Sequence, residues 1–272
     1  MTKYTTPTLE KLLGGNYKWW YILQFSFKAG TLYRGSTLIY MIGRIAVLSL
    51  TIFIWWLNID SGSRLIDFPT VFTYYVIGSM FSWNNGLNWN IAQSIKNGSL
   101  SSRLLLPQSV FKVAFLKDFG WWLYSNLFET GLLALMAILG KQYIILSSPA
   151  NIMVYLLLFC ISYLFLSLFG IIIGSIAFFM TEVNGVVGLQ DDIRFFLSGK
   201  AIPLNLSPFL TPLTFLPFAL TFHHPMQIYL GKYTQLQTLY VFLGGLAWCL
   251  VLYVLAKLVF KLGLKRYESV GL

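Results

Sequence analysis

The stretch VVGLQDDIRFFLSG at residues 186–199 decides how many times this chain crosses a membrane. It is apolar enough to lie in a bilayer, yet it places Asp191, Asp192 and Arg194 almost side by side. If residues 185–200 cross, both ends of the chain lie on one side of the membrane. If they do not, the two ends lie on opposite sides, and the loop charges can decide between these cases.

The composition is that of an integral membrane protein. Of 272 residues, 57% are hydrophobic and only 10% are charged, whereas soluble domains have roughly 25% charged residues. A bilayer-crossing helix needs about 20 apolar residues. Apolar runs occur at residues 38–57, 70–90, 114–139, 151–180, 185–200 and 236–260. The sequence therefore predicts an all-α fold with six transmembrane helices.

The distribution of basic residues supports a crossing at residues 185–200. With six spans and both ends in the cytoplasm, the external Lys and Arg residues are Arg64, Lys141, Lys200 and Lys232. Arg44 and Arg194 lie within the membrane, and the other thirteen of the 19 are cytoplasmic. Without this crossing the split is nearly even, and the usual cytoplasmic excess of positive charge is lost. Both termini are therefore predicted to be cytoplasmic.

Three regions are expected. Residues 1–37 form a cytoplasmic N-terminus and a helix in the membrane interface, because residues 18–36 mix aromatic and basic side chains. The alternative for this helix is a cytoplasmic extension of the first span. Residues 38–262 form the six-span domain, and residues 263–272 form a cytoplasmic tail.

The segment 201–232 holds five of the nine prolines of the chain, among them Pro203, Pro217 and Pro225. Proline inside a helix removes a backbone hydrogen bond and clashes with the preceding turn. An uninterrupted spanning helix is therefore not expected here. Short re-entrant helices on the external side, between spans five and six, fit the pattern better.

The loop after the second span reads IKNGSLSSRLLLPQS at residues 95–109. Leu100 and Leu104 are four residues apart and share a helix face, and Pro107 ends the helix. The spacing predicts a short amphipathic helix over residues 95–106 in the cytoplasm. Its apolar face has no evident partner in the loop, so a groove on a partner protein is one interpretation. A simple interfacial loop helix is the other.

Charged side chains inside the predicted spans are costly in a bilayer, so they usually pair or face a cavity. Arg44 lies about two turns into the first span, and Asp191 and Asp192 about two turns into the fifth, so their depths match. We expect Arg44 to pair with one of these two carboxylates. Arg194 faces another carboxylate or water, and Glu129 in the third span is a candidate partner. This polar belt either lines a substrate path or locks the spans together.

Several classes of function are disfavoured. The net charge of +10 is better explained by asymmetric loops than by nucleic-acid binding. No GxxxxGK[ST] phosphate-binding loop occurs, so ATP hydrolysis is not expected in this chain. Cys160 and Cys249 are isolated in apolar runs, and the adjacent His223 and His224 do not share a helix face. We therefore assign no metal site and no catalytic residue.

The loop at residues 95–109 resembles the cytoplasmic coupling helix of type 2 ABC transporter permeases, in which Gly, Leu and Pro at this spacing follow the second span. Two further stretches are similar to one branch of that family. One is residues 196–231, with FLSG, IPL and LPF in this order, and the other is the tail GLKRYESVG at residues 263–271. Together with the six spans, the resemblance covers almost the whole chain.

The resemblance implies a permease subunit in the plasma membrane that pairs with a second, identical or related, permease chain. It also implies docking on ABC-type ATPase subunits that bind ATP and Mg, and outward transport of an amphipathic or hydrophobic compound. The coupling helix would contact the ATPase through Ile95, Gly98, Leu100, Arg103, Leu104 and Pro107. The proline-rich segment would close the external end, with Pro203, Pro217 and Pro225 in the gate.

Two other classes of function remain open from the residues alone. A secondary transporter could be driven by protons through the intramembrane carboxylates. A lipid-modifying membrane enzyme would need converging catalytic groups, and the doublet Asp191 and Asp192 is the only candidate, although neighbours on a helix point apart. Dependence on ATP or on a proton gradient separates the first of these from an ABC permease.

Overall fold

The computed structural model describes residues 17–60, 67–80, 86–180 and 182–267, and these are helical with no strand among them. Residues 1–16 of the predicted N-terminal region, Arg64 and residues 268–272 of the tail lie outside the described residues. The elements in order are α2 (Tyr17–Leu32), α3 (Arg34–Asp60), α4 (Phe68–Met80), α5 (Leu87–Lys96), α6 (Leu100–Leu104), α7 (Val110–Leu139), η2 (Lys141–Tyr143), α8 (Pro149–Ser175), η3 (Ile176–Phe178), α9 (Asn184–Leu197), η4 (Thr211–Phe215), η5 (Pro217–Thr221), α10 (His223–Tyr229) and α11 (Gln235–Leu264).

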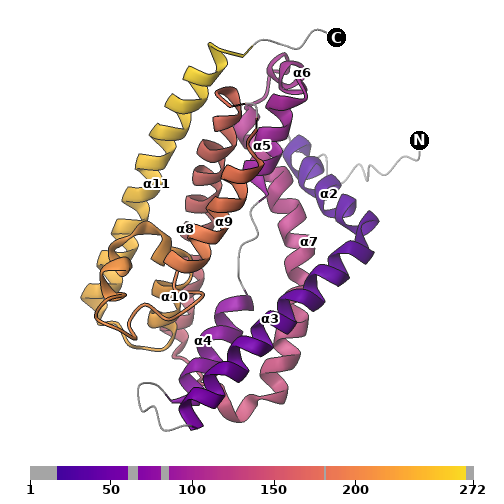
Figure 1. Cartoon of the computed structure of the whole chain (residues 1–272). Coiled ribbons are helices and arrows are strands. Elements are labelled where there is room, and N and C mark those ends of the chain that lie inside the picture. Colours follow the sequence, from indigo (N-terminus) through magenta and orange to yellow (C-terminus); the bar gives the residue numbers. More distant parts are fainter. Residues whose placement is uncertain (1–16, 61–66, 81–85, 181, 268–272) are drawn as a thin grey trace.

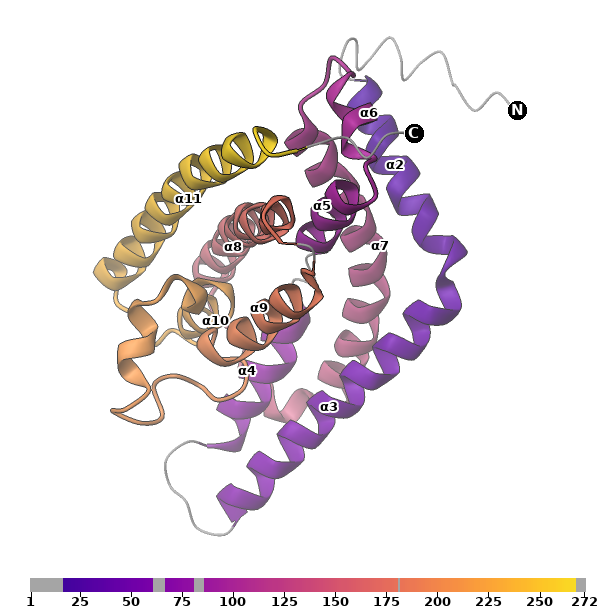
Figure 2. The same cartoon turned by 45° about the horizontal axis from the view of Figure 1, so that its top comes forward.

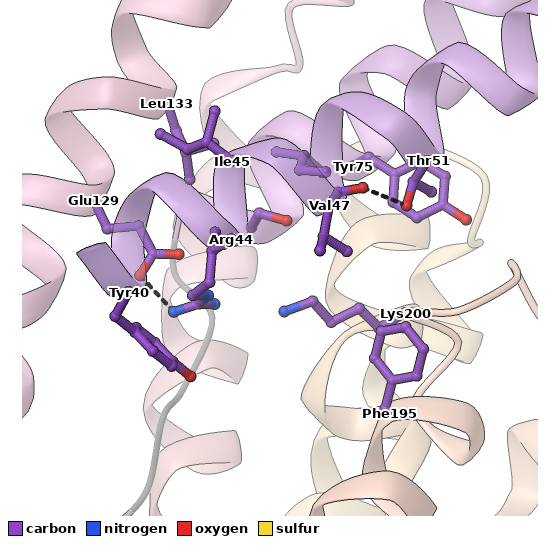
Figure 3. A pocket seen from close by; sticks show the side chains of 13 residues that line it. Tyr40, Arg44, Ile45, Val47, Thr51, Tyr75, Glu129, Leu133, Phe195 and Lys200 are labelled. Atoms are coloured by element: carbon purple, nitrogen blue, oxygen red, sulfur yellow. Dashed lines mark hydrogen bonds and ion pairs between the residues drawn. The ribbon is translucent and has the colours of Figure 1, made fainter. Parts of the chain in front are cut away.

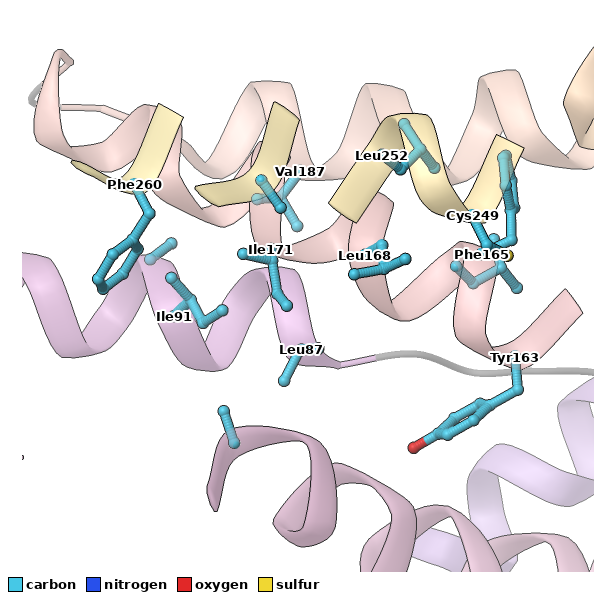
Figure 4. Close-up of a cluster of buried hydrophobic side chains, with 14 of the residues drawn as sticks. Leu87, Ile91, Tyr163, Phe165, Leu168, Ile171, Val187, Cys249, Leu252 and Phe260 are labelled. Atoms are coloured by element: carbon cyan, nitrogen blue, oxygen red, sulfur yellow. The ribbon is translucent and has the colours of Figure 1, made fainter. Parts of the chain in front are cut away.

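Four helices of the described chain are long and apolar enough to cross a membrane. They are Arg34–Ile59, Val110–Leu139, Pro149–Phe178 and Gln235–Leu264. Helix α8 is central, with α11 against one side and α5 against the other (Figures 1 and 2). The main core lies where these helices meet, with side chains such as Ile91, Ile171 and Leu252 converging (Figure 4). The all-α prediction is confirmed at this level.

Helices α2 and α3 lie on the outside of the bundle. Helix α2 packs along α7, where the rings of Phe27 and Tyr124 meet edge to face at 5.6 Å and Lys112 lies 4.0 Å above the ring of Trp19. Helix α3 runs diagonally across the bundle (Figure 2). Its outer side chains, among them Ile39 and Ile42, are exposed. The helix predicted near residues 18–36 is therefore present, although it ends at Leu32.

The structure describes two helices within the second predicted span, residues 70–90, and residues 81–85 of that span lie outside the described residues. Helix α4 ends at Met80 and α5 begins at Leu87. Polar side chains of α7 bind the two facing ends. Asn126 and Thr130 donate hydrogen bonds to the Met80 carbonyl at 3.1 and 2.8 Å, and Asp118 accepts one from the Gly86 amide at 3.0 Å. These side chains satisfy the backbone groups of Met80 and Gly86, as buried backbone at membrane depth requires.

The fifth predicted span is shorter than a bilayer. Helix α9 has 14 residues, which gives about 21 Å, whereas the hydrocarbon core is about 30 Å thick. The chain turns after Leu197, because Gly199 has φ of +82°, a conformation that favours glycine. The prolines that follow produce η4, η5 and the seven-residue α10 instead of a spanning helix.

We predict that Asp118→Ala destabilises the protein by about 1–3 kcal/mol, because the Gly86 amide and the hydroxyl of Tyr163 lose their buried acceptor. The thermal unfolding midpoint of the purified chain in one fixed detergent measures this. The matched control is Asp192→Ala, whose carboxylate is exposed. Equal midpoints for the two variants would contradict the role given to Asp118.

Candidate functional site: a charged cavity and an exposed coupling segment

A charged cavity lies between α3, α4, α7 and the end of α9. Arg44 of α3 donates a hydrogen bond from Nη1 to Oε2 of Glu129 on α7, with 2.5 Å between the two atoms. The Glu129 side chain is only 8% exposed and that of Arg44 19%. Figure 3 shows this pair on one wall of the cavity and Lys200 reaching toward it from the other. The ion pair holds α3 against α7 with both charges matched.

The predicted pairing of Arg44 with Asp191 or Asp192 is wrong. Arg44 binds Glu129, and Asp191 instead binds Arg194 on its own helix, with 3.1 Å between Nη2 and Oδ1. Asp192 is exposed. Matching depth could not identify the partner, because α7 lies nearer to Arg44 than α9 does. The polar belt is real, but its two ion pairs divide the charges differently.

Lys200 is a cavity residue that the sequence prediction placed outside the membrane. Two adjacent tyrosines of α4 hold the backbone on either side of it. Tyr74 donates to the carbonyl of Gly199 at 2.9 Å, and Tyr75 donates to that of Ala201 at 3.1 Å. The sequence signal was the glycine directly before a lysine in an apolar run. That turn brings Lys200 back toward Arg44.

The charged cavity adjoins two further spaces, and the three have charged residues in common. The first space, which is the charged cavity itself, has a volume of about 430 Å³ and is lined by Arg44, Glu129 and Lys200 together with apolar residues of α3. A second, of about 480 Å³, lies toward α2 and also reaches Arg44 and Glu129. A third, of about 190 Å³, adds Asp191 and Arg194. Arg44 therefore lies where all three spaces meet, and its partner Glu129 lines the first two.

The predicted helix over residues 95–106 is a turn and a shorter helix. Helix α5 ends at Lys96, the chain turns at Gly98, whose φ is +72°, and α6 covers Leu100–Leu104. Leu100 is completely buried in the main core together with Ile95, so neither can contact a partner. The prediction that Leu100 and Leu104 form one docking face is wrong for Leu100.

The exposed apolar surface lies one turn further on. Leu104 is 41% exposed, Leu105 86% and Leu106 55%. Pro107 is exposed beside them and Arg103 is half-buried. We call residues 104–106 the leucine turn. It projects from the end of the molecule that also holds the start of α2 and the end of α11 (Figure 1).

Tyr267, just after α11, fixes this segment to the rest of the bundle. Its hydroxyl donates to the Gly98 carbonyl at 3.1 Å and accepts from the hydroxyl of Ser101 at 3.1 Å. Its ring packs on Phe178 with 5.7 Å between centroids. Tyr267 therefore connects the segment around α6 to η3 and to the end of α11.

We predict that Tyr267→Phe increases amide hydrogen exchange at Ser101, whose N–H binds the Gly98 carbonyl, because both side-chain hydrogen bonds at this turn are lost. The change is expected to be several-fold and confined to the segment around α6. Tyr253→Phe, which alters an exposed ring on α11, serves as the control. Unchanged exchange at Ser101 would show that Tyr267 does not hold the turn.

The proline-rich segment lies at the opposite end from α6. Pro217 begins η5, and Pro203 and Pro225 are buried. His223 and His224, to which the sequence assigns no metal site, are buried too. His224 donates from Nε2 to the Thr214 carbonyl at 2.9 Å, so its Nδ1 accepts from the Tyr233 hydroxyl at 2.8 Å. Side-chain hydrogen bonds thus pin the irregular chain in place.

The architecture defines a helical membrane protein with a charged internal cavity and an exposed apolar turn at one end. Among the described residues, no group of three or more His, Cys, Asp or Glu side chains is placed to hold a metal ion. A family model described as ABC-2 family transporter protein matches residues 45–271, and no curated protein matches the chain.

The chain belongs to the ABC-2 transporter family. It is therefore an ABC transporter permease, a transmembrane component of transport that is not itself catalytic. Members of this family generally work with an ABC-type ATPase.

Proposed function

We propose that this chain is the permease subunit of an ABC exporter in the plasma membrane, coupling ATP hydrolysis on a separate subunit to outward transport of an amphipathic or hydrophobic compound. The observation that carries the proposal is the leucine turn, which is exposed while its neighbour Leu100 is anchored in the core. An exposed apolar turn on a rigid base suits a groove on a partner. ATP and Mg are bound by that partner.

The coupling path follows from the contacts of α6. Leu100 belongs to the same buried cluster as Ile91 of α5 and Phe260 of α11, and Tyr267 adds two hydrogen bonds. When ATP closes the partner subunits, the leucine turn moves with them, and the packed helices shift as units because a dense core does not deform continuously. The permease then favours an outward-open state.

Six crossings with both termini in the cytoplasm belong to this proposal. The crossings are α3, α4 together with α5, α7, α8, α9 together with the chain that follows it, and α11. The end with α6 carries basic residues including Lys96, Arg103, Lys112 and Arg266, whereas the other end carries Lys141 and Lys232 among the described residues. The positive-inside rule places the first of these ends in the cytoplasm.

Two further parts of the proposal concern the outer surfaces. The segments η4, η5 and α10 are re-entrant elements that close the external end of the pathway, with Pro203, Pro217 and Pro225 fixing their turns. The second permease chain, identical or related, completes the pathway. The exposed apolar face of α3 is available to lipid or to that chain.

Co-purification tests the proposal. The full chain is extracted from its native membrane in mild detergent, bound proteins are identified by mass spectrometry, and the complex is assayed for ATP hydrolysis. We expect a protein with a GxxxxGK[ST] loop that is lost in Leu105→Asp and retained in Leu146→Asp. Leu105 and Leu146 are both 86% exposed, but they lie at opposite ends of the bundle. If no protein with such a loop co-purifies in repeated experiments, the proton-coupled alternative is favoured. That alternative predicts that an uncoupler stops export and that removal of ATP does not.

A further inference from the structure

The charged cavity and the adjoining third space are lined by three basic and two acidic side chains. The acidic and basic side chains that line the first and third spaces are Arg44 from α3, Glu129 from α7, Asp191 and Arg194 from α9, and Lys200. Glu129 pairs with Arg44 and Asp191 with Arg194. Among the described residues, Lys200 forms no ion pair; its ammonium lies 5.9 Å from the centre of the Phe222 ring. An unmatched cation in a low-dielectric site is costly unless an anion joins it.

The position of Lys200 is built rather than incidental. The hydroxyls of Tyr74 and Tyr75 hold the carbonyls on either side of it, and Trp55 in turn donates to the Tyr75 hydroxyl at 3.1 Å. The Ser198 carbonyl accepts from the His223 amide at 3.0 Å. The side chain therefore extends from a fixed backbone into the cavity (Figure 3). A fixed cation loses little entropy when it binds an anion.

Most of the remaining cavity wall is apolar. Ile45, Val47, Leu48, Leu133 and Phe195 line the same space as Lys200 and Arg44. Its volume of about 430 Å³ falls within the range of roughly 300–1,000 Å³ found for small-molecule sites. A site with a cationic end and an apolar wall matches a ligand with an anionic head and an aliphatic body.

We propose that this cavity binds an amphiphile that carries one net negative charge, with its head between Lys200 and Arg44 and its aliphatic part along α3 and Leu133. That the amphiphile is exported rests on the proposed function. Binding itself does not, because every residue of the site belongs to this chain. The head can be a carboxylate or a phosphate, and its source can be a bilayer lipid or a single-chain compound.

Direct binding tests this inference on the full chain in nanodiscs of zwitterionic phosphatidylcholine, without any ATPase. The probes are dodecyl phosphate and dodecylphosphocholine, which share the chain and the phosphate but differ in net charge. We expect dodecyl phosphate to bind at least about tenfold more tightly, the effect of one hydrogen bond to a charged group. Lys200→Gln is expected to lose that preference, and Lys141→Gln, an exposed lysine, to keep it.

The remaining outcomes are distinguishable. Lys200→Arg keeps the positive charge and is expected to retain the preference for dodecyl phosphate. Comparison of Lys200→Arg with Lys200→Gln therefore separates loss of the cation from a general folding defect at this position. If phosphatidylglycerol in the nanodisc displaces dodecyl phosphate, the head belongs to a bilayer lipid. If only dodecanoate displaces it, the head belongs to a single-chain carboxylate. Either result supports the site. Equal binding of the two dodecyl probes to the unmodified chain would overturn it. Binding by the purified chain, together with the absence of an ATPase from the co-purification in native membrane, would leave the site standing and remove the exporter.

Discussion

Replacing Arg44 with methionine is expected to destabilise the protein by about 3–5 kcal/mol, because Glu129 is left as an unpaired charge that is largely buried. Glu129→Met is also expected to destabilise the protein, because Arg44 loses the carboxylate with which it forms this ion pair. The double variant should recover most of the loss, since two apolar side chains of similar size replace the pair. Unfolding of each protein in the same detergent gives the coupling energy of the double-mutant cycle.

Arg34→Met is the matched control, because it removes an exposed arginine from the same helix. It should change stability by about 0.5 kcal/mol or less. If the double variant is as unstable as the sum of the two single variants, the two residues do not act as a pair. Export by the double variant then separates the two roles left open for these charges. A structural lock predicts normal export once stability returns, whereas a substrate path predicts a stable protein that does not transport.

Leu100→Asp is expected to yield no folded protein, because it buries a carboxylate without a partner in the main core. The milder Leu100→Ala should cost about 2–5 kcal/mol through the cavity that it leaves. Leu105→Ala, five residues later on the exposed leucine turn, should leave the unfolding midpoint within the effect of about 0.5 kcal/mol typical of surface changes. Recovery of stable Leu100→Asp protein would show that Leu100 is not a core residue.

The helical fold and the charged residues could be predicted from sequence, but the contacts between helices could not. Apolar runs long enough for a bilayer identified the four long helices. Depth along a span indicated that Arg44 and Glu129 would lie within the membrane, yet it does not say which helices are neighbours. The spacing of Leu100 and Leu104 places both on one helix face. Only the structure shows that Leu100 is buried in the main core with residues of α5.

Two local sequence patterns bear on where the helices begin and end. Helix α5 begins directly after Gly86, and the run NNG at residues 84–86 is a sequence pattern that favours turns over helix interiors. Lys200 was counted as external because the fifth helix was assumed to continue through Gly199. A glycine followed by a proline four residues later was the sign that the chain turns back there. Asp118, which binds the free end of α5, lies in an apolar run where sequence offers no partner for it.

The most direct test of the account is site-specific photo-cross-linking in the native membrane. A photoreactive amino acid is placed at position 105 or, as a control, at position 146, since Leu105 and Leu146 are equally exposed at opposite ends. The account predicts an adduct with an ATPase that carries a phosphate-binding loop from position 105 and none from position 146. An adduct from position 146, or an ATPase that co-purifies but is reached from neither position, would contradict the assignment of the leucine turn as the coupling surface.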